Sequence, residues 1–114
     1  MIPIYSSKGK TVGWIEDDVI IDRSNRCRAF INDGKVYSYR GGYLGEFQDG
    51  FFWDKRGSAV AFIVGARGGP ITPIPEISPI PPIPPIPPIP PIPPIPPIHF
   101  LGWSQLDLEV FLSS

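Results

Sequence analysis

The sequence predicts an all-β domain that is followed by an extended proline-rich segment and a short C-terminal helix. Three observations support this: a 16-residue repeat present in four copies between residues 4 and 66, turn-forming residues at two fixed places in each copy, and intervening runs rich in Val, Ile, Phe, Tyr and Trp. We expect an eight-stranded antiparallel meander whose four hairpins close into a shallow, pseudo-four-fold barrel. We assign residues 1–69 to this domain, 70–98 to a polyproline II segment and 99–114 to a short apolar segment.

The repeat is defined by aligning the chain with itself at a shift of 16 residues. Its four copies begin at Ile4, Ile20, Val36 and Phe52. One position in the second half of each copy is always small, and it holds Gly13, Ala29, Gly45 and Ala61. Such a position is typical of crowding near a barrel axis, whereas a β-bulge would favour glycine. Because alanine occupies two of the four places, crowding fits better than a bulge.

Two turns recur in every copy. The first turn reads Lys8-Gly9, Ser24-Asn25, Arg40-Gly41 and Arg56-Gly57, and the second reads Asp17-Asp18, Asp33-Gly34, Asp49-Gly50 and Gly65-Ala66. Gly, Asn and Asp tolerate the positive φ angles that two-residue type I′ turns require. The spacing of these turns predicts strands of about six residues.

The meander places alternate turns at opposite ends of the domain, so it also separates charge. The second turns collect Glu16, Asp17, Asp18, Asp33 and Asp49 at an acidic end. The first turns collect cations at the other end, which we predict to face anions: Lys8, Lys10, Arg23, Arg26, Arg40, Lys55 and Arg56. Because neither half of the chain is strongly basic overall, we expect no nucleic-acid partner.

Isoleucine recurs at every third residue through the proline-rich segment. From Ile71 onward the row that we predict to contact partners comprises Ile74, Ile77, Ile80, Ile83, Ile86, Ile89, Ile92, Ile95 and Ile98. Polyproline II has three residues per turn, so these side chains would lie along one face. A semi-rigid spacer is the alternative. A continuous apolar row favours packing instead, against the same row in another subunit, an apolar groove of its own domain, or an aromatic surface of another protein.

The last residues predict a short apolar helix. Ser104 and Asp107 have the spacing of a capping box, and apolar residues such as Leu108 and Phe111 follow. A helix this short is unstable alone in water. We expect it to dock on its own domain, with docking on a partner as the alternative.

Few residues are candidates for chemistry. His99 stands outside the repeat with no evident partner, and Cys27 aligns with packed strand residues, so neither predicts catalysis. The equivalent positions Ser6, Asp22, Ser38 and Asp54 could converge on a hard cation, but bonding to their own turns is the simpler interpretation. We therefore expect no catalytic residue, no metal site and no cofactor.

The order of segments is characteristic. The hairpin repeats end in Gly68-Gly69-Pro70, a run of Ile-Pro-Pro follows from Ile80 to Ile98, and the tail carries Gly102-Trp103-Ser104. In this, the chain resembles the four-fold β-flower family of uncharacterised bacterial proteins with a C-terminal Ile-Pro-Pro tail. The resemblance covers nearly the whole chain and implies a shallow, flower-shaped barrel whose hairpins are petals. It implies no activity and carries over no functional residue.

From these features we expect a non-catalytic binding or assembly module whose Ile-Pro tail contacts a protein partner or another copy of itself. One alternative is peripheral membrane or lipid binding, in which the basic end meets anionic headgroups and an apolar cup takes acyl chains. A small metal-dependent enzyme is a third hypothesis. The single cysteine, and the lack of a recognisable signal peptide or membrane-spanning run, lead us to expect a cytoplasmic protein.

Overall fold

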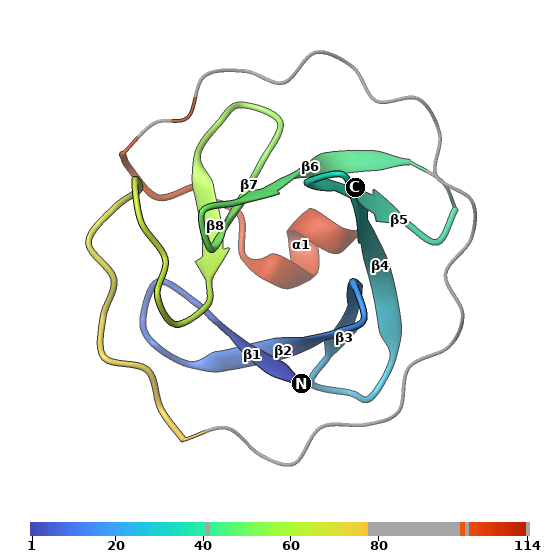
Figure 1. Ribbon diagram of the computed structural model, residues 1–114, viewed down its shortest axis with the longest axis horizontal. Helices are drawn as coiled ribbons and strands as arrows, with labels where there is room; N and C mark the ends of the chain where they lie inside the picture. Colours follow the sequence, from blue (N-terminus) through green and yellow to red (C-terminus); the bar gives the residue numbers. More distant parts are fainter. Residues whose placement is uncertain (41, 78–98, 100, 114) are drawn as a thin grey trace.

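The computed structural model describes residues 1–40, 42–77, 99 and 101–113. Its strands are β1 (Ile2–Tyr5), β2 (Thr11–Glu16), β3 (Val19–Asp22), β4 (Cys27–Asn32), β5 (Lys35–Ser38), β6 (Tyr43–Gln48), β7 (Phe51–Trp53) and β8 (Ala59–Phe62), and one helix, α1 (Leu108–Leu112), follows. In Figure 1 the strands form a ring with α1 at its centre. The principal extents are 34 × 34 × 21 Å, which is the flat shape expected of a shallow barrel.

Each strand pairs with the next one in the chain, and β8 pairs with β1, so the sheet is a closed antiparallel barrel. The predicted eight-stranded meander and its closure are therefore confirmed. We call its hairpins petal 1 (residues 2–16), petal 2 (19–32), petal 3 (35–48) and petal 4 (51–62). The seam between petals 4 and 1 is the thinnest, because only Tyr5 and Phe62 pair across it.

The second turns have the predicted geometry in three cases out of four. Both central residues have positive φ in Asp17-Asp18, Asp33-Gly34 and Asp49-Gly50, as type I′ turns require. The prediction is wrong for Gly65-Ala66, where only Gly65 has positive φ. Here β8 has already ended and the described residues after it form no further strand, so the chain is not held in a two-residue hairpin.

The first turns are longer than predicted. Five residues separate β1 from β2, and in this loop the backbone of Ser6 pairs with Lys10 while Gly9 alone adopts positive φ. Asn25 and Gly57 have positive φ at the matching places of petals 2 and 4, whereas Gly41 lies outside the described residues. These loops shorten the first strand of each hairpin to three or four residues, while the second strands reach six in all but petal 4.

The repeat position that is always small lies beside a β-bulge and is also crowded, so both explanations considered for it hold. In every petal the strand register shifts once, which leaves Val12, Arg28, Leu44 and Val60 as bulged residues just before the small ones. The small residue is also crowded, because a Cβ on Gly13 would lie 2.4 Å from the carbonyl oxygen of Ile21. A Cβ on Gly45 would lie 2.0 Å from the carbonyl oxygen of Trp53 and 3.0 Å from the ring of Phe111. A neighbouring strand and α1 therefore keep this position small.

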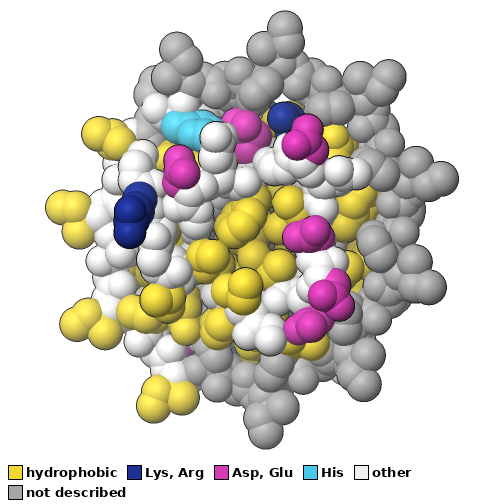
Figure 2. Space-filling view, viewed as in Figure 1, with side chains coloured by type: hydrophobic (Ala, Val, Ile, Leu, Met, Phe, Trp, Pro, Cys, Tyr) yellow, Lys and Arg dark blue, Asp and Glu magenta, His cyan; other side chains and the backbone are white. Residues whose placement is uncertain are grey.

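The main core lies inside the barrel and includes the helix. Leu108, Phe111 and Leu112 join one buried cluster with inward-facing strand residues such as Ile20 and Phe52. Aromatic residues at equivalent positions of the repeat are also buried, at 2% exposure for Tyr37 and 1% for Trp53. On the face shown in Figure 2, acidic side chains lie along the top and right of a hydrophobic centre and few Lys or Arg appear, which agrees with the predicted separation of charge.

Candidate functional site: the helix-filled mouth and the tail

The four equivalent residues of the first turns serve their own loops. Asp22 Oδ1 accepts hydrogen bonds from the backbone N–H groups of Ser24 and Arg26, at 2.9 and 3.0 Å. Asp54 Oδ1 makes the same two bonds in petal 4, and the hydroxyls of Ser6 and Ser38 accept backbone bonds in petals 1 and 3. The structure therefore supports the turn-bonding interpretation over a shared cation site.

The helix fills the mouth of the barrel at the end where the first turns lie. Its N-cap is Asp107, whose carboxylate accepts the Val110 N–H at 2.9 Å, so the predicted capping box beginning at Ser104 is wrong. The prediction that the helix docks on its own domain is confirmed by the burial of Leu108, Phe111 and Leu112. The same burial corrects the idea of an open apolar cup, because these side chains occupy it.

Arg28 ties the helix to petal 2, a role that sequence reasoning did not assign. Its guanidinium donates to Asp22 Oδ2 at 3.0 Å, to the carboxylate of Glu109 on α1, and to the hydroxyl of Ser113 at 2.9 Å. Burial alone would raise the pKa of Asp22, but hydrogen bonds from Arg26, Arg28 and Ser24 outweigh it and hold that pKa below its ordinary value. The charge at this one bulged position, where the other petals have Val or Leu, is the signal that could have revealed it.

The described part of the isoleucine row faces solvent. Ile71, Ile74 and Ile77 are 95%, 93% and 98% exposed. They do not pack into a groove of their own domain, which removes one of the three predicted contacts for this part of the row. The rest of the predicted row, from Ile80 to Ile98, lies outside the described residues.

Glu76 anchors this segment to petal 1, which the sequence did not suggest. Its carboxylate accepts the backbone N–H of Thr11 at 2.6 Å and lies near Lys10 and Arg23, while its own N–H donates to the carbonyl of Gly9 at 2.9 Å. The Thr11 hydrogen bond, supported by the two cations, lowers the pKa of Glu76. Gly9 leaves room for this contact, because a Cβ there would lie 2.5 Å from the carbonyl oxygen of Ile74.

A second anchor holds the chain where it returns to the barrel. The imidazole of His99 stacks on Trp53 with ring centroids 4.0 Å apart, and its Nε2 lies 2.8 Å from Glu46 Oε1. Further on, the backbone of Ala59 pairs with Gly102 and Ser104. The expectation that nothing positions His99 is therefore wrong, and the contacts identify it as an anchor.

Cys27 is the packed strand residue that its alignment predicted. It lies half-buried against the cluster formed by Trp14, Val19 and Ile21. Burial raises the pKa of its thiol, which disfavours the nucleophilic thiolate.

The predicted basic end divides into two groups. Lys10 and Arg23 approach Glu76, and Arg26 approaches Asp22. Within the described part of the chain, no ion pair engages the other cations of this end, which are Lys8, Arg40, Lys55 and Arg56.

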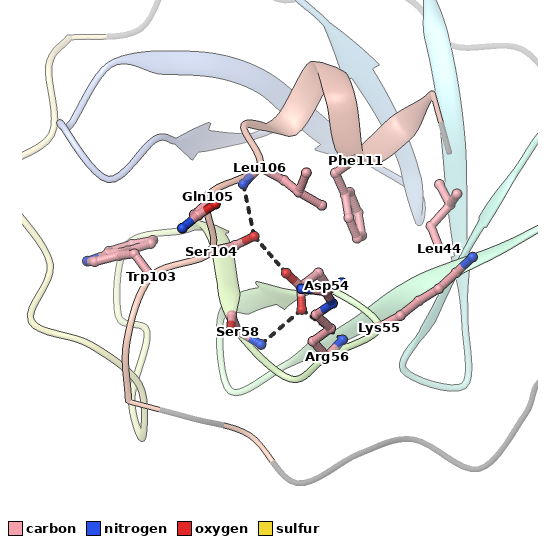
Figure 3. A pocket seen from close by; sticks show the side chains of 10 residues that line it. All are labelled: Leu44, Asp54, Lys55, Arg56, Ser58, Trp103, Ser104, Gln105, Leu106 and Phe111. Carbon is pink, nitrogen blue, oxygen red and sulfur yellow. Dashed lines mark hydrogen bonds between the residues drawn. The ribbon is translucent and has the colours of Figure 1, made fainter.

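Two pockets flank α1 at equivalent places of the repeat. The petal-4 pocket, of about 550 Å³, is lined by Leu44, Asp54, Lys55, Arg56, Ser58, Trp103, Ser104, Gln105, Leu106 and Phe111. The petal-2 pocket, of about 240 Å³, is lined by Val12, Asp22, Arg23, Ser24, Asp107, Leu108, Glu109 and Leu112. Asp54, Lys55 and Arg56 occupy the repeat positions of Asp22, Arg23 and Ser24. Figure 3 shows how the β7–β8 loop and the segment before α1 form opposite walls of the larger pocket.

Across residues 1–40, 42–77, 99 and 101–113, no group of three or more His, Cys, Asp or Glu side chains is placed to hold a metal ion. The part of the chain that the structure describes also has no helix with the length and apolar character needed to cross a membrane.

Comparison with known proteins agrees with this architecture. The family model described as "4-fold beta flower protein" matches residues 2–112. Searches of curated proteins and of solved structures gave no match. Since the match spans the barrel, the tail and the helix, the chain belongs to the 4-fold beta flower protein family.

Proposed function

We propose that this protein is a non-catalytic assembly module in which the isoleucine row of the tail joins copies of the chain. The observation that supports this most directly is the near-complete exposure of Ile71, Ile74 and Ile77 at a regular spacing of three residues. Large aliphatic side chains exposed in a continuous row are typical of an interaction surface.

The backbone of the described tail segment is held against petal 1, while the isoleucine side chains of this segment remain exposed. Glu76, which lies between Ile74 and Ile77 in the chain, is hydrogen-bonded to Thr11 and Gly9 of petal 1. A row that is already ordered loses less conformational entropy when a partner binds it. This arrangement favours a contact surface over a plain spacer, for which a fixed backbone position has no use.

The row is suited to a second copy of itself. In polyproline II, three residues rise about 9 Å, which leaves a gap between successive isoleucines that an isoleucine from another copy can fill. Two copies of the same row therefore interdigitate without any further surface. The roles found for His99, as an anchor, and for Cys27, as a packed residue, support the non-catalytic part of the proposal.

Light-scattering mass after gel filtration tests the proposal on the full chain. We expect an oligomer for the natural protein and at least about a tenfold weaker association when Ile71, Ile74 and Ile77 are all changed to Ser, because each buried isoleucine contributes about 1.5–3 kcal/mol. The control changes Ile2 and Val64 to Ser, since both are exposed apolar residues outside the row, at 48% and 68%. A natural chain that remains monomeric at high concentration would overturn self-assembly and point to a different protein partner.

A further inference from the structure

The petal-4 pocket combines a cationic edge with an apolar wall. Lys55 and Arg56 are exposed on its β7–β8 loop, and neither forms an ion pair with any described residue. Leu44 and Phe111, which are about 1% exposed, also line the pocket and supply apolar surface. From this arrangement we propose that the pocket binds a small amphipathic anion, meaning an anionic group carried on an apolar chain.

The volume and the lining suit such a ligand. Small-molecule pockets are mostly 300–1,000 Å³ and are apolar with a few polar groups, and this pocket has about 550 Å³. Lys55 and Arg56 supply charge-assisted hydrogen bonds for the anionic group, and Leu44, Leu106 and Phe111 contact the apolar chain.

Asp54 does not oppose the anion strongly, because its oxygens are already engaged. They accept hydrogen bonds from the backbone N–H groups of Arg56 and Ser58 and from the hydroxyl of Ser104, at 2.9, 3.0 and 2.6 Å. Figure 3 shows the bonds to Ser58 and Ser104 within the loop and the wall of the pocket. The pocket thus keeps two uncompensated cations against one compensated carboxylate.

The equivalent petal-2 pocket lacks these properties. It is less than half as large, at about 240 Å³. Its lining has one cation, Arg23, and three carboxylates, those of Asp22, Asp107 and Glu109. Arg23 itself donates to the carbonyl of Thr11 and lies near Glu76. Since both pockets derive from the same part of the repeat, the difference isolates the features that favour an anion in petal 4.

Titration of the full chain with octanoate tests the site, read by calorimetry and by the indole N–H signals in ¹H–¹⁵N spectra. The chain has three Trp residues, and Trp103 lines the pocket, so we expect its indole signal to move most. Changing Lys55 and Arg56 together to Gln should weaken binding by about tenfold or more, as lost hydrogen bonds to a charged group do. Acetate and octanol, which each lack one half of the ligand, should bind much more weakly than octanoate.

The matched control changes Lys8 and Arg40 to Gln. Both occupy the repeat position of Arg56, neither lines the pocket, and the double variant removes the same net charge. We expect it to bind octanoate like the natural chain. Equal loss in both double variants would overturn the site, because the effect would then come from overall charge, and so would the absence of octanoate binding or equally tight binding of acetate.

Vesicles distinguish a free amphiphile from a lipid headgroup. Co-sedimentation with phosphatidylglycerol vesicles, but not phosphatidylcholine vesicles, that is lost with the Lys55 and Arg56 changes would assign the anion to a lipid. Octanoate binding without vesicle binding would assign it to a soluble ligand. The site does not depend on self-assembly, and the isoleucine variant used above should retain it.

Discussion

Petals 2 and 4 carry equivalent loops between their two strands and contact the same helix, but they hold it in different ways. Asp22 and Asp54 are both buried, and each accepts two backbone hydrogen bonds from its own loop. The other carboxylate oxygen of Asp22 accepts a hydrogen bond from the Arg28 guanidinium, whereas that of Asp54 accepts one from the Ser104 hydroxyl. The repeat thus fixes where the carboxylates lie, and individual substitutions decide what they bind.

The bulged position shows how petals 2 and 4 differ in their link to the helix. Petal 2 has Arg28 there, which reaches Glu109 and Ser113 and joins α1 to the sheet through charge. Petal 4 has Val60 at the equivalent place, which packs into the same buried core cluster as Leu108, Phe111 and Leu112 of α1. With a short apolar side chain in place of a long ionic one, petal 4 makes no charged link to α1 from this position.

The largest expected effect comes from removing the petal-2 link. Arg28→Ala should lower the free energy of unfolding by about 3 kcal/mol, because it removes the charged partner that lies 3.0 Å from the buried Asp22 carboxylate. Val60→Ala at the equivalent site should cost only about 1.5 kcal/mol, the loss of two buried methyl-sized groups. Urea unfolding followed by circular dichroism measures both.

A double variant sharpens this comparison. Once Asp22→Asn has removed the buried charge, adding Arg28→Ala should cost less than it does alone, since the two side chains share one interaction. Additive losses, or equal losses for Arg28→Ala and Val60→Ala, would contradict the ionic link that we assign to petal 2.

A smaller effect is expected on the petal-4 side. Ser104→Ala removes the donor to Asp54 and the acceptor of the Leu106 N–H, at 2.6 and 3.0 Å, and should cost about 1–2 kcal/mol. Ser113→Ala, whose hydroxyl is an exposed partner of Arg28, serves as the control and should cost less. Thermal unfolding compares the two, and a loss no greater for Ser104 would show that the Asp54 contact is energetically unimportant.

The smallest expected effect is a pH dependence of the unfolding free energy that arises from Asp22 in petal 2. Because the pKa of Asp22 is lower in the folded chain than its ordinary value of 3.8, its stabilising contribution is present above about pH 4 and is lost as the pH falls through the lowered pKa. The difference in unfolding free energy between the natural chain and Asp22→Asn should therefore shrink between about pH 6 and about pH 2. A difference that stays constant over this range would contradict the lowered pKa.

Much of the architecture could be predicted from local patterns. The 16-residue period, the paired residues with positive φ and the β-branched runs predicted the meander, its closure and three of the four type I′ turns. These features depend on residues that are close in sequence, so a single chain displays them directly. The family resemblance agreed with the matched family model.

The contacts that define the candidate site were harder to predict. Arg28 meets Glu109 across 81 residues of sequence, and Thr11 meets Glu76 across 65. No local pattern marks such partners, since Glu76 and Glu109 each resemble an exposed charge in the sequence and the Thr11 contact uses only a backbone N–H. The capping box failed for a related reason, because Ser104 is directed at Asp54 instead of beginning the helix.

The sequence by itself determined the four hairpins, because turn sterics and strand preference act within a few residues of each other. Only the tertiary structure decided that α1 closes the mouth, that Glu76 and His99 anchor the tail, and that the two equivalent pockets differ in size and charge. These outcomes depend on which side chains the closed barrel brings to one end. That proximity arises from long-range closure of the chain, and the one-dimensional order of residues does not contain it.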